Sequence, residues 1–261
     1  MKHYIVAILA IIWISYYFID SFQSDLWFEN EYINAKYELL TKENTKDITN
    51  ITQENITEQT ESGIDNTTVQ TKDRVDLFVD FYPQSPFWKW GPIFEDTCEE
   101  ASLLLALNYI KWDYMNRIQF RDELLKIVDW QNKNFWYFKD TSVEQTAEIL
   151  KRMYNFNNLE IINNPEISDI KQALSDGNIV IAPLYAIWLN PNYWGNWPNY
   201  HFLVIKWYTK NSFITHDVGT NKWENYVYNQ NTLYNRIHDY HPTDIKLGEK
   251  RIIVLKKIEL N

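Results

Sequence analysis

The stretch FEDTCEEASLLLAL (residues 94–107) contains the only cysteine of the 261-residue chain. Leu103, Leu104 and Leu107 recur at the spacing of one face of a helix, so the pattern predicts an apolar helix over about 98–110. The three leucines are expected on its buried face. The helix would present the cysteine at its N-terminus.

Cys98 stands where the predicted helix begins, with Asp96 or Thr97 as N-cap. A helix N-terminus lowers the pKa of a thiol through its unpaired N–H groups and its dipole. Glu99 and Glu100 occupy the first turn and oppose formation of a thiolate, so a nucleophilic thiol needs a cationic partner nearby. Two interpretations stay open: Cys98 is a nucleophile, or it is a small buried apolar residue.

The candidate partner is His201, which opens an alternating strand, HFLVIKWYT. The candidate third group is Asp217. If residues 209–211 form a three-residue hairpin loop, Asp217 lies opposite Leu203 on the face of His201. A two-residue loop turns Asp217 to the other face and leaves the three groups apart. The remaining histidines of this region are expected to be structural or surface residues: His216, His238 and His241.

The rest of the pattern predicts helices followed by strands, the order of an α+β fold with a mostly antiparallel sheet. Ser142 with Gln145 forms a capping box, and Gly177 is suited to end a helix. The further helices are expected over about 118–129, 143–154 and 167–176. The strands are expected over 178–184, 201–209, 213–218, 224–228 and 250–258.

The N-terminal part differs sharply in composition. Residues 4–19 are apolar or aromatic apart from Ser15, Lys2 precedes them and acidic residues follow. This predicts a signal anchor over 1–22 with a cytoplasmic N-terminus and an extracellular C-terminal domain, on a single-pass membrane protein. A cleaved secretion signal is the alternative. Residues 23–73 are predicted to form a polar stalk and residues 74–261 the folded domain.

Charge and motifs exclude several classes of function. The formal net charge of −10 does not suit a nucleic-acid partner. The chain has no HExxH motif and no metal-spaced Cys/His group, no glycine-rich phosphate loop and no G-x-S-x-G serine elbow. We therefore expect neither a metal nor a cofactor.

Four segments resemble the bacteriocin-processing, or double-glycine, peptidases and their C-39-like relatives, which have a papain-like fold. The resemblance implies that Cys98 is the nucleophile, His201 the base and acid, and Asp217 the group that orients His201. It also implies that Gln84 donates to the oxyanion. Cys98 is followed by Glu99, whereas the bacteriocin-maturing enzymes carry glycine there. The matching segments are VDFYPQSPF (79–87), EDTCEEAS (95–102), YHFLVIKWY (200–208) and FITHDVGT (213–220).

The sequence thus predicts a membrane-anchored extracellular cysteine peptidase that acts on a peptide or protein substrate. Two alternatives remain: a hydrolase of cell-wall peptides, and a catalytically silent papain-like binding module. The substrate groove is expected to be walled by four tryptophans: Trp88, Trp90, Trp194 and Trp197.

Overall fold

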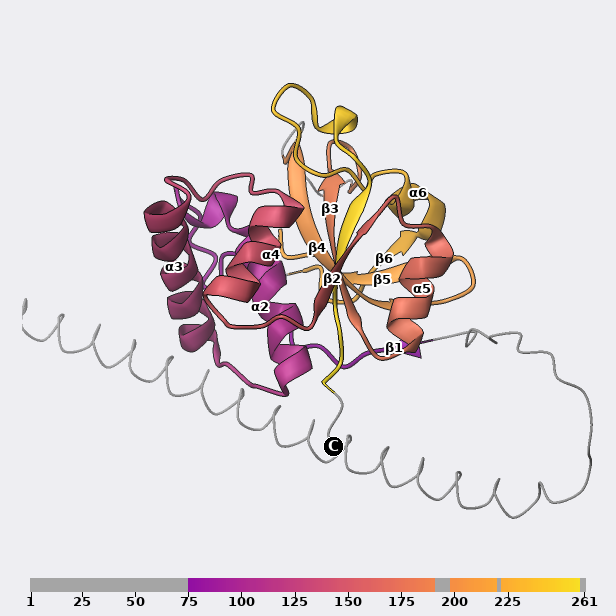
Figure 1. Ribbon diagram of the computed structural model, residues 1–261, viewed down its shortest axis with the longest axis horizontal. Coiled ribbons are helices and arrows are strands. Elements are labelled where there is room, and N and C mark those ends of the chain that lie inside the picture. Colours follow the sequence, from indigo (N-terminus) through magenta and orange to yellow (C-terminus); the bar gives the residue numbers. More distant parts are fainter. Residues whose placement is uncertain (1–74, 191–197, 220–221, 259–261) are drawn as a thin grey trace, which may run out of the picture. The chain divides into compact units, whose positions relative to one another are not determined.

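The computed structural model describes residues 75–190, 198–219 and 222–258 (Figure 1). The chain divides into two units, 1–68 and 69–261, and every described residue belongs to the second. The predicted anchor and stalk, like Trp194 and Trp197, lie outside the described residues. Within the described part, no helix combines the length and the apolar character needed to cross a bilayer.

The order of elements is mostly helices and then strands, as expected, with a β-strand inserted between the third and fourth long helices. The helices are α2 (Cys98–Lys111), α3 (Arg117–Asn134), α4 (Val143–Arg152), α5 (Ile167–Ser175) and α6 (Gln230–Tyr234), with 3₁₀ turns η1 (Phe94–Asp96) and η2 (Ile245–Leu247). The strands are β1 (Val75–Asp76), β2 (Leu159–Asn163), β3 (Ile179–Tyr185), β4 (Tyr200–Tyr208), β5 (Ser212–His216), β6 (Tyr226–Asn229) and β7 (Arg251–Leu255).

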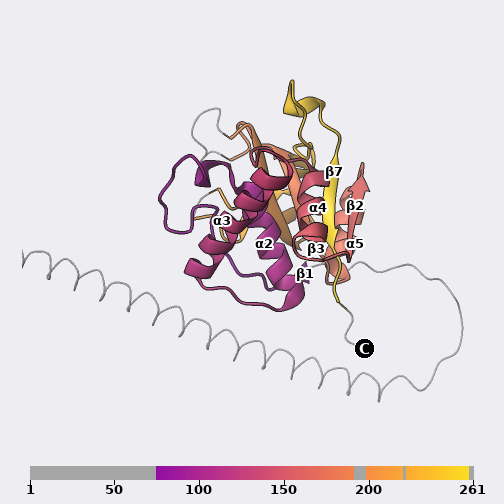
Figure 2. The same ribbon diagram turned by 60° about the vertical axis from the view of Figure 1, so that its left-hand side comes forward.

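The strands form one sheet in the order β2-β7-β3-β4-β5-β6, with β1 on β4, and every pairing is antiparallel. Helices α2, α3 and α4 lie on one side of the sheet, and α5 and α6 on the other (Figures 1 and 2). Each side has its own apolar core. The α+β prediction is confirmed, but the sequence pattern missed the short strands β1 and β2.

Two local predictions are confirmed by the backbone. Ser142 and Gln145 form the capping box of α4, and Gly177 follows α5 with a φ of 78°. An unpredicted second capping box, Asn116 with Gln119, opens α3. That helix runs five residues further than the sequence pattern indicated, because buried side chains continue into its last turns.

Helix α2 is central, and this corrects the expectation of a single buried face. It packs on β3, β4 and β7 and is covered by α3 and α4. All residues from Cys98 to Asn108 are therefore buried, including Glu99 and Glu100 at 1% and 0% exposure. The acidic first turn lies in the interior.

The β4–β5 hairpin has the shorter of the two loops considered. The N–H of Thr209 donates to the carbonyl of Ser212 at 2.9 Å, which leaves only Lys210 and Asn211 in the loop. Tyr208 pairs with Phe213 in this register. A regular ladder from this loop would place Asp217 opposite Val204, on the wrong face for His201.

A β-bulge corrects the register. Pairing shifts between Ile205 and Trp207, so that Lys206 is the extra residue and Val204 pairs with His216. Continued by one step, this register sets Asp217 opposite Leu203, as the longer loop would have done. The prediction that a two-residue loop separates the groups is therefore wrong, because it assumed an unbroken ladder.

Candidate active site

Cys98 is held at the first position of α2, where its side chain faces β4. Thr97 stands at the N-cap, but its hydroxyl donates to the carbonyl of Gln84 at 3.3 Å instead of capping the helix. The Cys98 thiol is 6% exposed and donates to Oε2 of Glu99 at 3.1 Å. Burial raises the pKa of the Cys98 thiol, and a backbone hydrogen bond from Phe202, the residue after His201, opposes this rise in part. The sulfur therefore lies against the start of β4.

His201 and Asp217 form a buried pair. His201 Nε2 lies 2.8 Å from Asp217 Oδ1, and the two side chains are 2% and 0% exposed. The bulge in β4 is what brings the carboxylate to this face. The geometry is that of a carboxylate fixing the orientation of an imidazole ring, the role that the resemblance implies for Asp217.

Asp217 is itself held by donors that the sequence pattern did not single out. Tyr228 of β6 donates its hydroxyl to Oδ2 at 2.7 Å, and the N–H of Gly219 donates to Oδ1 at 3.2 Å. Asn190 donates to the Tyr228 hydroxyl at 3.2 Å and accepts from Tyr226 at 3.4 Å. The only available signal was the alternation of Tyr226 and Tyr228 along one strand.

A cavity of about 260 Å³ brings the two halves of the site together. Cys98, His201 and Gln84 all contribute to its lining. Asp217 is hydrogen-bonded to His201 but does not line the cavity. Trp88 and Trp90, predicted to wall the groove, are 54% and 42% exposed and are not among the lining residues. The remaining lining residues are Glu95, Asp96, Glu99, Asp140, Pro198, Asn199, Tyr200, Tyr240, His241, Pro242, Thr243, Asp244 and Ile245.

Gln84 is in the right place but its donors are engaged. Its side-chain amide donates to the carbonyls of Phe94 and Glu95 at 3.0 and 3.1 Å. Its Oε1 is buried without a hydrogen-bond partner among the described residues. Gln84 therefore joins the loop before α2 to the cavity, and its role as an oxyanion donor stays a prediction.

The interior position of α2 governs the electrostatics of the thiol. Burial raises the pKa of Cys98 well above its usual value, and the neighbouring Glu99 raises it further by its charge and hydrogen bond. Burial also raises the pKa of Glu99, and the negative charge of Glu100 raises it further. Burial raises the pKa of Glu100 to about 8. Removal from water disfavours the charged form of all three groups.

The other three described histidines occupy structural or half-buried positions, as the sequence pattern predicted. His216 contacts the carbonyl of Val79 through Nε2 at 2.8 Å and accepts from the N–H of Asn225 through Nδ1. His238 contacts the carbonyl of Gly248. His241 is half-buried, as expected of a surface or packing residue, and it also lines the cavity. Within the described ranges, no three His, Cys, Asp or Glu side chains are grouped so as to hold a metal ion.

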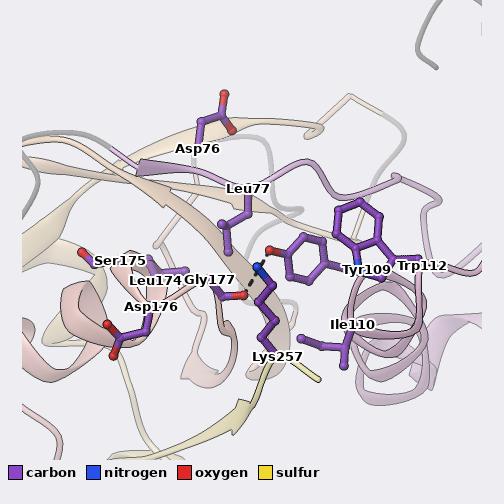
Figure 3. Close-up of a pocket in the computed structure, with 10 residues that line it drawn as sticks. All are labelled: Asp76, Leu77, Tyr109, Ile110, Trp112, Leu174, Ser175, Asp176, Gly177 and Lys257. Carbon is purple, nitrogen blue, oxygen red and sulfur yellow. Dashed lines mark hydrogen bonds between the residues drawn. The ribbon is translucent and has the colours of Figure 1, made fainter. Parts of the chain in front are cut away.

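A larger cavity, of about 410 Å³, lies at the opposite end of α2 (Figure 3). Tyr109 and Trp112 flank it, and the Tyr109 hydroxyl donates to the carbonyl of Gly177 at 3.1 Å. It contains no candidate nucleophile beside a base. Size therefore does not identify the site; the chemistry of the lining does.

The match to a family model agrees with the family that these residues resemble. Residues 77–243 match the model of the Peptidase_C39 like family, and the chain belongs to that family. A search of curated proteins found no match. Among solved structures, the chain is similar to a protein from Bacillus anthracis assigned to the C39-like peptidases. That match has 13% identity and a TM-score of 0.43, and it covers 72% of this chain and 100% of the other.

Proposed function

We propose that the protein is a membrane-anchored extracellular cysteine peptidase that hydrolyses amide bonds of peptides with Cys98, His201 and Asp217. Family membership supports a cysteine peptidase. The observation that carries the proposal is the shared cavity: the only cysteine lines the same space as a buried histidine, which Asp217 holds from outside the lining. The apolar segment of residues 4–19 supports the anchor.

The route of the proton depends on which ring nitrogen of His201 is bonded to Asp217. Asp217 holds His201 through Nε2, so Nδ1 is the nitrogen that takes the proton of the Cys98 thiol. The thiolate attacks the substrate carbonyl, and the proton then passes from His201 to the leaving amine. Water hydrolyses the thioester with His201 as base, which releases the acid and restores the thiol.

Stabilisation of the oxyanion is assigned first to the backbone N–H of Cys98 at the start of α2. For Gln84 to contribute, one of its two bonds to the carbonyls of Phe94 and Glu95 must be exchanged for the oxyanion. The orphaned Oε1 of Gln84 shows that this side chain is not held by bonds at both ends.

One observation favours a second candidate, a catalytically silent binding module of the same fold. Cys98 donates to a buried carboxyl group, and that group and burial together raise the thiol pKa. A thiol in such surroundings is a poor nucleophile unless His201 or another group compensates.

The test uses the full chain with a library of unstructured peptides and a mass-spectrometric readout of cleavage. We expect cleavage by the wild type and none above background by Cys98→Ala or His201→Ala. The mutation Glu160→Gln, at an exposed position on β2, is the matched control and should leave cleavage unchanged. Cleavage that persists in Cys98→Ala would contradict the proposal, and absence of cleavage by the wild type would favour the silent module.

A further inference from the structure

Glu99, the residue after the proposed nucleophile, contacts the thiol directly. Glu99 is 1% exposed, and both of its carboxyl oxygens have defined partners. Oε2 accepts from the Cys98 thiol at 3.1 Å, and Oε1 accepts from the backbone N–H of Thr141 at 3.0 Å. The carboxyl group is therefore fixed between the nucleophile and the segment that precedes α4.

The surroundings of Glu99 oppose its ionised form. Burial and the negative charges of Glu100 and Asp140 raise its pKa. In the part of the chain that the structure describes, no lysine or arginine lines the cavity or forms an ion pair with Glu99. The titratable groups around it are Cys98 and Glu100 on α2, Glu95 and Asp96 on η1, Asp140 before α4, Tyr200 and His201 on β4, and Tyr240, His241 and Asp244 on the segment before η2.

The hydrogen bonds decide which oxygen carries the proton of the neutral acid. A backbone N–H requires an acceptor, so the bond from Thr141 fixes Oε1 as the carbonyl-like oxygen. The acid proton then sits on Oε2, which is the oxygen that faces sulfur. A protonated carboxyl group is a hydrogen-bond donor as well as an acceptor. Oε2 can thus accept from the thiol and donate to the thiolate.

We propose that Glu99 works as a neutral carboxylic acid whose Oε2–H donates a hydrogen bond to the Cys98 sulfur once the thiol proton has passed to His201. In this step the S–H bond breaks and an N–H bond forms on the imidazole. Glu99 keeps its own proton throughout, and no oxidant or reductant is involved. The inference rests on the proposed function, since it gives a role within the same site.

This role removes the conflict in the sequence around Cys98. An ionised Glu99 would repel a thiolate 3.1 Å away in a buried site, whereas a neutral acid stabilises it. Buried carboxylic acids that stay neutral in order to donate to a developing anion are an established device in other enzymes. The same burial that penalises the thiolate therefore supplies it with a donor.

The experiment measures the rate at which iodoacetamide alkylates Cys98 in the full chain near neutral pH. The variants are Glu99→Gln, whose amide N–H can replace the acid as donor, and Glu99→Ala, which removes the donor. We expect Glu99→Gln to stay within about fivefold of the wild type and Glu99→Ala to react at least about tenfold more slowly than Glu99→Gln, the size of one hydrogen bond to a charged group. Glu160→Gln, the same substitution at an exposed position, should match the wild type.

The other outcomes overturn the inference. A Glu99→Gln rate lower by more than fivefold means that the ionised carboxylate is needed, as a base. A rate higher by more than fivefold means that the ionised carboxylate suppresses the thiol. Equal rates for Glu99→Gln and Glu99→Ala mean that no donor is required.

Failure of the inference about Glu99 can be distinguished from failure of the proposed function. If wild-type Cys98 reacts no faster than free cysteine and His201→Ala changes nothing, the peptidase itself is in doubt, whatever Glu99 does. If Glu99→Gln does not fold, an infrared difference spectrum between the wild type and Glu99→Ala at neutral pH replaces it. A protonated carboxyl band present only in the wild type supports a neutral Glu99, and the absence of that difference overturns the inference.

Discussion

The two sides of the cavity are built differently. On the imidazole side, His201 is held by Asp217, which in turn is held by Tyr228 and Gly219. On the thiol side, Cys98 lies against a carboxyl group in the interior of the fold, and its pKa is raised. The imidazole of His201 is already oriented in the structure, whereas the Cys98 thiol depends on partners to ionise.

The comparison shows that the β-sheet fixes the geometry of the imidazole side, whereas α2 sets the electrostatic surroundings of the thiol. Strand pairing fixes the position of His201 in β4, and Asp217 directly follows β5, where its N–H donates to the carbonyl of Trp223 at 3.2 Å. The helix adds a dipole that favours a thiolate, but its central position adds a desolvation penalty that opposes it. Mutations on the two sides should therefore fail in different ways.

Apart from the loss of Cys98 or His201 themselves, the largest effect is expected from Asp217→Ala on the imidazole side. His201 loses its acceptor, and the Tyr228 hydroxyl and Gly219 N–H are left without one. The rate of peptide cleavage should fall by about a hundredfold or more, by analogy with loss of a group that acts through the base. Asp217→Asn, which keeps an acceptor for His201, should lose less. Undiminished cleavage by Asp217→Ala would remove Asp217 from the site.

Tyr228→Phe tests whether the hydroxyl that donates to Asp217 contributes to the cleavage rate. It removes the hydroxyl that donates to Asp217 Oδ2 at 2.7 Å and leaves the ring in place. The cleavage rate should fall by about tenfold, the size of one hydrogen bond to a charged group, with an altered pH profile. Tyr226→Phe, one step further from Asp217, is the matched control and should stay within about threefold, since it removes a hydrogen bond between neutral groups. Equal effects of the two variants would contradict the network.

On the thiol side, Glu100→Gln should change the pH dependence of stability. The pKa of Glu100 is raised from 4.5 to about 8 on folding, so the folded state holds this proton more tightly than the unfolded state. The contribution of Glu100 to stability is therefore greatest below about pH 4.5 and is lost as the pH rises through about 8. Urea midpoints measured across this range should decline less in Glu100→Gln than in the wild type. A decline parallel to that of the wild type, which Glu160→Gln is expected to show, would mean that Glu100 is not the source.

The smallest effect is expected from Gly219→Ala. An added methyl group would lie 3.1 Å from the Trp223 ring and 3.4 Å from both Asp217 Oδ1 and His201 Cε1. The imidazole side must shift by a few tenths of an ångström, so the turnover rate should fall by about threefold to tenfold, the size of a mild overpacking penalty. The Michaelis constant should change little, because Gly219 does not line the cavity. A change confined to the Michaelis constant would be the contrary result.

Much of the fold was predictable because its signals are local. The capping box at Ser142, the positive φ of Gly177 and the apolar spacing of α2 depend on residues a few positions apart. Strand β1 escaped prediction because it has only two residues, and β2 because its pattern is only partly buried, so that alternation does not distinguish it from a loop.

The residues of the candidate site could be named from the sequence, but the way in which the fold brings them together could not be predicted. Cys98, His201 and Asp217 could be named from residue type and position. The alignment of Asp217 with His201 depends on the bulge at Lys206, for which the alternating pattern gave no sign. Beyond the bulge, Tyr208 takes the place expected for Trp207 on the face of Leu203 and Ile205. The hydroxyl of Tyr228 was missed, since nothing along the chain links it to Asp217.

By itself, the sequence determined which side chains can do chemistry and which segments form α2, β4 and β5, because propensity, capping and apolar spacing act over short distances. Only the tertiary structure decided that α2 is buried on every side, that a bulge compensates a short hairpin loop, and that Glu99 contacts the thiol. Burial and strand register are set by contacts between distant segments, and those contacts decide the charge state of each group as well as its position.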